Sequence, residues 1–258
     1  MICLVNCLKL TLCLLLSLFS AYAYSDTITV AAYSPPNNPY FFAASENKGI
    51  VNDIFSELSK ITGDTYVFKY VPPARAIFLF DKGDLDIEAS VNPSWRMDVK
   101  VKGIYSIPFD KAKDVIVFRS GQKVPVSSPE SLKGQVVGTV RGYVYPYFET
   151  AFKDGVVIRR DNTTESLLLM QLLAGRFNQV LLDLRKLQYE QLKHPDYRSF
   201  EVGNCIGETD VMMRIHPQKK NIVQGINDGL KQMLDTGVMA AIYSKYQLKG
   251  HEVIANCN

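Results

Sequence analysis

Asp183 is a carboxylate that directly follows the apolar residues 180–182, where the packing of a core would not need it. A buried carboxylate is costly unless a cation pairs with it, so Asp183 is a candidate to hold an ammonium group of a ligand. It could equally cap a helix or form an ion pair with Arg185 or Lys186. The residue types leave these roles open.

Arg96 is the matching candidate for an anionic group, because its planar guanidinium can hold a carboxylate through two hydrogen bonds. It stands next to Trp95, the single tryptophan of the chain. A solvated surface arginine is the alternative for Arg96. The pair follows residues 86–91, the third predicted strand.

Two tyrosines could form walls of a pocket. Tyr33 ends the first apolar run, and Tyr40 follows in a loop rich in proline and asparagine. Ligands of open α/β sheets lie beyond the carboxyl ends of the strands, where such loops gather. For Tyr40, packing onto the core is an equal alternative.

The turn at Gly142 and Tyr143 could bind an anion through backbone N–H groups, with Gly142 allowing a close approach. It links a predicted strand to a predicted helix start, but neither of the glycine-rich nucleotide-binding patterns occurs. A carboxylate, an arginine, free amides and aromatic walls together would suit a zwitterion such as an amino acid.

The composition argues against several classes of function. The chain has three histidines, each isolated, so a metal centre or a histidine-based triad is not expected, and no cofactor motif is present. The formal net charge is +3, which favours neither nucleic acid nor an anionic membrane surface as a partner.

The first 23 residues are typical of a signal peptide. An apolar stretch at 10–19 follows Lys9, and a small-x-small pattern predicts cleavage after Ala23 and export to the periplasm. A retained N-terminal anchor is the alternative. Cys205 and Cys257 are the cysteines that would remain, and in an oxidising compartment they predict one disulfide rather than two buried thiols.

Short β-like runs alternate with helix-like segments along the rest of the chain, which indicates an α/β fold. The order suggests two units that pack as lobes of one body. Strands are predicted at 27–33, 66–71, 86–91, 114–119, 135–140, 179–183 and 210–214. Helices are predicted at 50–58, 74–82, 164–174, 219–236 with an interruption near Gly229, and 238–246.

Motifs along nearly the whole mature chain resemble the extracellular solute-binding protein family 3, the polar amino acid binders with a type II periplasmic-binding fold. The segment LKGQVVG at 132–138 is similar to the family's L-K-G-x-x-V-G, and GRFNQVLLD at 175–183 is similar to G-R-x-D-A-x-x-x-D. Further similarities lie at 48–54, at Arg75 with the following G-x-x-D of 83–86, and at 235–246.

The resemblance implies an α/β fold of two lobes, each a mixed sheet flanked by helices, with hinge crossovers near 109–113 and 205–209. Residues 24–110 and 207–258 would form lobe 1, and residues 111–206 lobe 2. The ligand would lie between the lobes and be buried by hinge closure. Arg96 would hold an α-carboxylate with the Gly142 and Tyr143 amides, Asp183 an α-ammonium, and Tyr40 one wall.

Some residues depart from the family pattern. Tyr143 stands where the family has threonine, and the segment before Arg96 is about two residues short, so that Trp95 or Arg75 could take its place as the contact. The Pro73-Ala74-Arg75-Ala76 motif indicates a divergent branch. These differences bear on the ligand and not on the fold.

The function implied is therefore that of a monomeric periplasmic binding protein, not an enzyme and not stably inserted in a membrane. It would deliver a small polar ligand, an amino acid or related small acid, to an inner-membrane ABC permease. One alternative is a prephenate-type dehydratase on the same fold, for which Glu88 or Glu165 could serve as the general acid. The other is a ligand sensor that signals through a separate membrane protein.

Overall fold

The computed structural model of the chain describes residues 27–248. The predicted cleavage site after Ala23 and the cysteine at position 257 lie outside the described residues, so the signal peptide and the Cys205–Cys257 disulfide stay predictions. Within residues 27–248, no helix combines the length and the apolar character that a membrane crossing requires.

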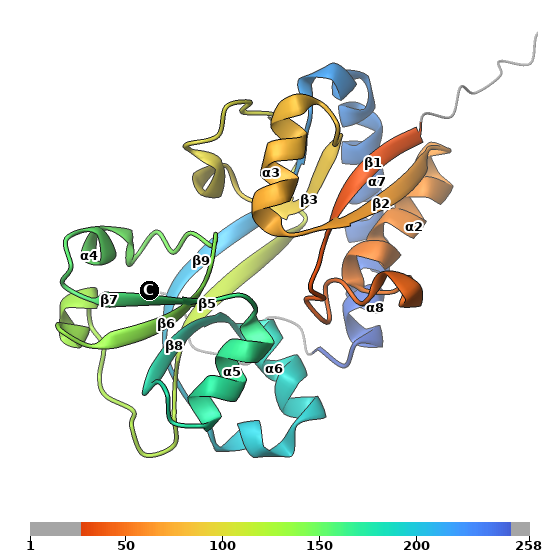
Figure 1. Ribbon diagram of the computed structural model, residues 1–258. Helices are drawn as coiled ribbons and strands as arrows, with labels where there is room; N and C mark the ends of the chain where they lie inside the picture. Colours follow the sequence, from red (N-terminus) through yellow and green to blue (C-terminus); the bar gives the residue numbers. More distant parts are fainter. Residues whose placement is uncertain (1–26, 249–258) are drawn as a thin grey trace, which may run out of the picture.

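One curled mixed sheet runs through the molecule in the strand order β2-β1-β3-β9-β5-β8-β6-β7, with β4 beside β9 (Figure 1). The strands are β1 (Thr27–Tyr33), β2 (Thr65–Val71), β3 (Ile87–Val91), β4 (Ile104–Tyr105), β5 (Asp110–Phe118), β6 (Val136–Val140), β7 (Ile158–Asn162), β8 (Gln179–Asp183) and β9 (Glu201–Ile215). The helices are α2 (Ile50–Thr62), α3 (Pro73–Lys82), α4 (Glu149–Lys153), α5 (Glu165–Leu173), α6 (Leu184–Lys193), α7 (Val223–Asp235) and α8 (Val238–Lys245).

The first lobe is built on the parallel strands β2, β1 and β3, with helices on both faces (Figure 1). Side chains alternate across β1, so that Val30 faces the core shared with α2, α7 and α8 while Ala31 faces α3. Because both faces are covered, β1 is apolar without alternation from Val30 to Ala32.

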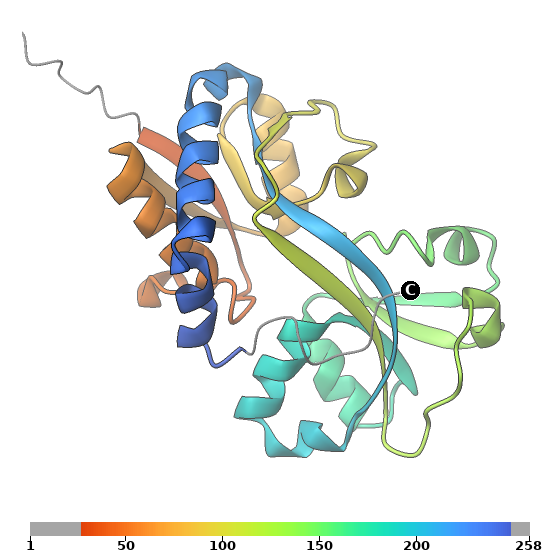
Figure 2. The same ribbon diagram turned by 180° about the vertical axis from the view of Figure 1, so that it is seen from behind.

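The second lobe repeats this layering on β5, β8, β6 and β7. Val115 and Val180 face a core with α5 and α6, while Ile116 and Leu181 face a second core that includes α4. Figures 1 and 2 show α5 and α6 together at one end of this lobe, and Tyr189 of α6 reaches the core of the first lobe.

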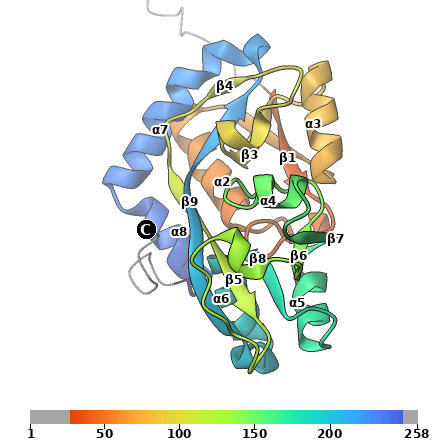
Figure 3. The ribbon, with the colours of Figure 1, turned by 90° about the vertical axis from the view of Figure 1, so that its left-hand side faces the viewer.

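The lobes are joined by β5 and β9, which form an antiparallel ladder from Asp110↔Val211 to Phe118↔Glu201. The far end of β9 pairs with β3 of the first lobe, while β5 pairs with β8 of the second. Figure 3 shows the two strands running between the lobes. The predicted two-lobed α/β architecture with two crossovers is thus confirmed.

Several elements differ from the sequence-based expectation. The helices α4 and α6 and the short strands β4 and β7 were not predicted. The helix start expected after Gly142 and Tyr143 is wrong, because α4 begins only at Glu149, and the strand predicted at 210–214 is the end of the longer β9. The interruption expected at Gly229 is wrong: Gly229 lies buried inside α7, where a Cβ would come within 2.7 Å of Leu58 Cδ2 on α2. This glycine allows two helices to approach closely rather than ending one.

Close packing also explains Gly138 in β6, where a Cβ would lie 2.7 Å from Leu168 Cδ1 and 2.9 Å from Val180 Cγ1. We therefore expect Gly138→Ala to lower the free energy of unfolding by about 1–3 kcal/mol, because the methyl group overpacks the core of the second lobe. Urea unfolding followed by circular dichroism measures the change.

Gly207 in β9 is the matched control, since a Cβ there meets no atom within 4 Å. Gly207→Ala should change the free energy of unfolding by less than about 0.5 kcal/mol. Equal effects of the two substitutions would show that the contact with Leu168 and Val180 does not constrain Gly138.

Candidate functional site

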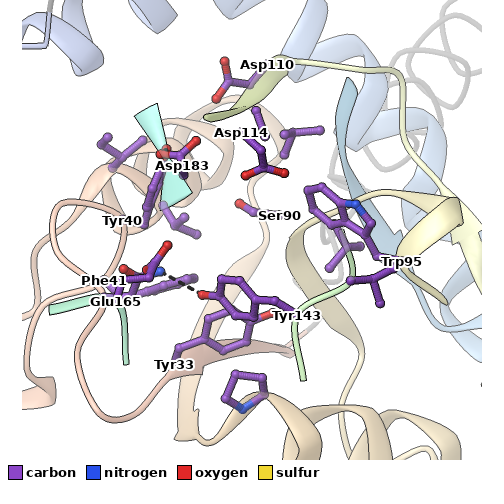
Figure 4. A pocket seen from close by; sticks show the side chains of 18 of the residues that line it. Tyr33, Tyr40, Phe41, Ser90, Trp95, Asp110, Asp114, Tyr143, Glu165 and Asp183 are labelled. Atoms are coloured by element: carbon purple, nitrogen blue, oxygen red, sulfur yellow. Dashed lines mark hydrogen bonds between the residues drawn. The ribbon is translucent and has the colours of Figure 1, made fainter. Parts of the chain in front are cut away.

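A cavity of about 140 Å³ lies between the lobes, and Figure 4 shows side chains surrounding its open centre. It is lined by residues of the first lobe, of the second lobe and of the connecting strands β5 and β9, so residues far apart in the sequence meet there. Of the predicted site residues, the cavity is lined by Tyr33, Tyr40, Trp95, Arg96, Gly142, Tyr143 and Asp183. The lining residues that sequence reasoning did not propose include Asn37, Phe41, Ser90, Asp110 and Asp114.

Asp183 ends β8 and is also the N-cap of α6, where its carboxylate accepts the Lys186 backbone N–H at 2.9 Å. The same oxygen accepts the Tyr40 hydroxyl at 2.8 Å, a contact between the two lobes. Burial raises the pKa of Asp183 above its usual range. The helix cap that the sequence left open is therefore present, and Asp183 faces the cavity as well.

Asp110 also lines the cavity, and its carboxylate binds Arg185. The guanidinium of Arg185 forms a bidentate ion pair with Asp110, and the hydroxyl of Tyr243 donates to the same carboxylate. Asp110 is thus neutralised by its own neighbour. Asp183 does not share that ion pair.

Asp114 and Glu165 are the other two carboxyl groups that line the cavity. Asp114 stands directly opposite Asp183 in the antiparallel pair of β5 and β8. Glu165 lies in the first turn of α5 with 5% of its surface exposed. Burial, followed by the charge of Asp183, raises the pKa of Asp114 to about 7, and burial raises the pKa of Glu165 to about 8.

Asp114 was missed because it precedes its apolar run. The signal that singled out Asp183 was a carboxylate after a run of buried residues, and Asp114 stands immediately before one, residues 115–118. In the antiparallel pair of β5 and β8, the residue that follows the apolar run of β8 stands opposite the residue that precedes the apolar run of β5. Once this pairing is known, Asp183 therefore identifies Asp114 as a second carboxylate of the site.

Arg96 lines the cavity, but its guanidinium is engaged by Glu88 of β3. Nε donates to both Glu88 carboxylate oxygens at 3.2 Å, Nη2 donates to Oε1 at 2.7 Å, and Nη1 donates to the Trp95 carbonyl at 3.0 Å. Arg214 of β9 also donates to Glu88. Arg96 is buried rather than a solvated surface arginine, and Glu88, at 0% exposure, does not line the cavity.

The turn at Gly142 lines the cavity, but the Tyr143 N–H already donates to the Val140 carbonyl at 3.1 Å. The Tyr143 hydroxyl accepts a hydrogen bond from Asn37 Nδ2 at 3.3 Å, a second contact between the lobes. Gly142 has a φ of +81°, which favours glycine at this position. The Tyr143 amide is therefore engaged by the chain itself.

Aromatic rings form much of the wall. Tyr33 and Phe41 lie 5.4 Å apart between ring centroids, and Figure 4 shows Tyr33 close to Tyr143 at one side of the cavity and Trp95 at another. Arg75 is the one predicted ligand-binding residue that does not line the cavity. It is exposed on α3 with its guanidinium 4.7 Å from the centroid of the Phe78 ring.

A sequence model of the bacterial extracellular solute-binding proteins, family 3, matches residues 27–249. No curated protein matches the chain. Similar solved structures include an ancestral arginine-binding protein bound to arginine, with 21% identity, 85% of this chain and 97% of that chain covered, and a TM-score of 0.69. The arginine-, lysine-, histidine-binding protein ArtJ from Geobacillus stearothermophilus has 18% identity, covers 88% and 98%, and has a TM-score of 0.70.

A histidine kinase sensor domain with similarity to periplasmic binding proteins is also similar, with 16% identity, 86% and 96% of the two chains covered, and a TM-score of 0.71. At these identities the solved structures show the fold alone. Across residues 27–248, no cluster of three or more histidine, cysteine or acidic side chains could hold a metal ion.

The raised pKa values of Asp114 and Glu165 make the empty protein sensitive to pH. Glu165 faces Lys186, which lowers its pKa, and Asp183, Asp114 and Glu190, which raise it; Asp114 faces Asp183. The folded protein holds both protons more tightly than the unfolded chain does. This contribution to stability is complete below about pH 4 and is lost as the pH rises through about 7 and 8.

We expect the free energy of unfolding to fall by about 2 kcal/mol or more from pH 5 to pH 8 through these two groups. The double variant Asp114→Asn, Glu165→Gln should flatten the profile, and the exposed Asp235→Asn should leave it unchanged. Urea titrations at each pH measure the effect. A profile that rises over this range in the wild type and not in the double variant would contradict the assignment.

Glu88 is the only anion that contacts Arg96 among the described residues, and it contacts Arg214 as well. We expect Glu88→Gln to destabilise the protein by about 3 kcal/mol or more, because the buried Arg96 loses its counter-charge and Arg214 keeps only Asp81, at 3.6 Å. Glu208→Gln, which disrupts surface ion pairs with Lys111 and Lys113, should cost less than about 1 kcal/mol. Thermal unfolding of both variants in one buffer makes the comparison.

Proposed function

The chain belongs to the bacterial extracellular solute-binding proteins, family 3, and on that premise we propose that it captures a small polar ligand with an ammonium group between its lobes. The family expected from the sequence motifs and the type II periplasmic-binding fold are confirmed. The binding of such a ligand, an amino acid or a related molecule, is supported by one observation above others. Asp183 and Asp114 face each other at a cavity lined by both lobes.

The proposed binding step is hinge closure about β5 and β9. A ligand shifts a hinge equilibrium only through contacts that differ between the open and the closed state. Tyr40 and Asn38 of the first lobe contact Asp183 and Lys186 of the second, at 2.8 Å and 2.7 Å. An ammonium group at Asp183 would lie at this junction and add a contact that forms only when the lobes meet.

We propose that the protein does no chemistry on the ligand and delivers it, in the periplasm, to an inner-membrane ABC permease. The family description, extracellular solute-binding proteins, supports the location and the role. The seven lining residues predicted from the sequence are proposed as ligand contacts. For Arg96 the proposed role is to hold Glu88 and to form the wall beside Trp95, since its guanidinium is already engaged.

Asp183→Asn is the variant that tests this function. The amide retains a side-chain oxygen for the N-cap of α6 but removes the negative charge. We expect it to weaken ligand binding at least tenfold and to abolish the ligand-induced decrease in the radius of gyration measured by small-angle X-ray scattering. The free energy of unfolding of the empty protein should fall by less than about 1 kcal/mol.

Asp196→Asn is a matched control, because Asp196 lies in the second lobe outside the cavity lining. It should leave affinity and compaction unchanged. Ligand affinity that survives Asp183→Asn within twofold would refute the role of Asp183, and the absence of any compaction in the wild type on adding ligand would refute hinge closure.

A further inference from the structure

Acidic side chains outnumber basic ones among the residues that line the cavity. Arg96 is the only lysine or arginine among the lining residues, and Glu88 opposes its charge. On the acidic side, Asp110 is paired with Arg185. The remaining three lining carboxyl groups take part in no ion pair with any other described residue. They are Asp114, Glu165 and Asp183.

Asp114 and Asp183 are the first acidic position. They are directly opposed residues of antiparallel strands, and side chains in that arrangement have Cβ atoms about 5 Å apart. Like charges at that separation repel, and burial adds to the cost. Figure 4 shows both carboxyl groups on the same side of the cavity. A cation between them would remove the repulsion.

Glu165 is the second acidic position. Figure 4 shows it apart from the Asp114 and Asp183 pair, and it comes from a different element, the start of α5. No hydrogen bond to its carboxyl group is present within residues 27–248, although the residue is only 5% exposed. The neighbouring cation, Lys186, is engaged by Glu190 at 2.7 Å and by the Asn38 carbonyl at 2.7 Å.

A ligand carboxylate, in contrast, finds no free cation here. The guanidinium of Arg96 holds Glu88, and the Tyr143 amide donates to Val140. An anionic group would enter a cavity with three carboxyl groups of its own. The aromatic walls of Tyr33, Trp95 and Tyr143 suit an alkyl chain, and their ring faces attract cations.

We propose that the preferred ligand is an organic dication that lacks a carboxylate, an alkyl diamine or a guanidinoalkyl amine. One cation lies between Asp114 and Asp183, and the other lies at Glu165. The inference rests on the proposed binding function and specifies the ligand class of the same cavity.

Binding of a dication should release protons from the cavity. The pKa values of about 7 for Asp114 and about 8 for Glu165 leave both groups largely protonated in the empty cavity at pH 6. A dication favours the ionised forms, so binding releases protons. Affinity for the dication therefore rises from pH 6 to pH 8.5, a range in which alkyl ammonium groups stay charged.

Matched pairs of compounds that differ only in the carboxylate test the proposal. Isothermal titration calorimetry with the full mature chain compares lysine with cadaverine, ornithine with putrescine and arginine with agmatine. We expect one decarboxylated compound to bind at least tenfold more tightly than its amino acid. N-acetylcadaverine, which has one cation, should bind at least tenfold more weakly than cadaverine. Neutral and acidic amino acids, glutamine and glutamate, complete the set.

The outcomes separate the two proposals. If an amino acid binds more tightly than its decarboxylated partner in every pair, or if only glutamine or glutamate binds, the dication inference is wrong and the binding function stands. If nothing in the set binds, the proposed function fails and the inference fails with it. If N-acetylcadaverine matches cadaverine, the second cation contributes nothing and the dication inference is wrong.

Variants locate the two cations. Asp114→Asn and Glu165→Gln should each weaken binding of the tightest diamine at least tenfold and reduce the number of protons released. Asp235→Asn, at an exposed position on α7, is the control and should change neither. A purely structural role for Asp114 predicts the opposite pattern, a lower melting temperature with unchanged affinity. On our proposal the empty Asp114→Asn protein melts no lower than the wild type, because a repulsion is removed.

Discussion

The antiparallel ladder between β5 and β9 is the constraint on which the site depends. It is the stretch of sheet that both lobes share, and it runs from Asp110↔Val211 at the first lobe to Phe118↔Glu201 in the second. The buried cores divide on β5 between Ala112 and Val115, and Tyr189 of α6 is the residue of the second lobe's helices that joins the core of the first. The cavity lies where the cores separate, and the ladder supplies Asp110, Asp114 and Val211 to its wall. Strands that join the lobes thus also line the cavity between them.

Buried charge is handled in two different ways in this molecule. Around Glu88, two guanidinium groups surround one carboxylate, and Asp81 lies 3.6 Å from Arg214, so the cluster is balanced. Around the cavity, Asp114 and Glu165 have no counter-ion within the described residues, and burial raises the pKa of each. A balanced cluster organises the fold, whereas an unbalanced one in a cavity costs stability unless a ligand completes it.

The sequence predicted the fold well because its signals are local and repeated. Apolar runs mark the buried strands, and the LKGQVVG and GRFNQVLLD motifs mark the second lobe. Elements without an apolar pattern were missed: α6 is mostly polar, and β7 is short and charged. Gly229 misled because a glycine in a helix predicts a break, and only the approach of Leu58 from α2 shows why it is there.

The site was predicted in its positions more than in its chemistry. Strand-end residues reach the cavity whatever their partners are, so Tyr33, Tyr40 and Asp183 could be found from their places along the chain. Partners come from tertiary structure: Arg214 reaches Glu88 across 126 residues of sequence. Whether a guanidinium is free to hold an anion depends on such a partner. For that reason, motif matching assigned Arg96 a carboxylate to bind without seeing that Glu88 already holds it.

Asp183 shows why one residue can carry several demands in a hinged protein. Its oxygen caps α6 and accepts the Tyr40 hydroxyl from the other lobe, and the residue stands opposite Asp114 in the antiparallel pair of β5 and β8. The N-cap hydrogen bond orders the Asp183 carboxylate when the protein folds. The entropy of ordering this side chain is therefore lost on folding and not on binding a ligand. On the proposed function, a ligand cation would meet an acceptor that is already oriented. Because Tyr40 of the other lobe contacts the same carboxylate, that cation would also strengthen a junction between the lobes. Asp183 can take these roles together because β8 ends, α6 begins and the two lobes meet at this one residue.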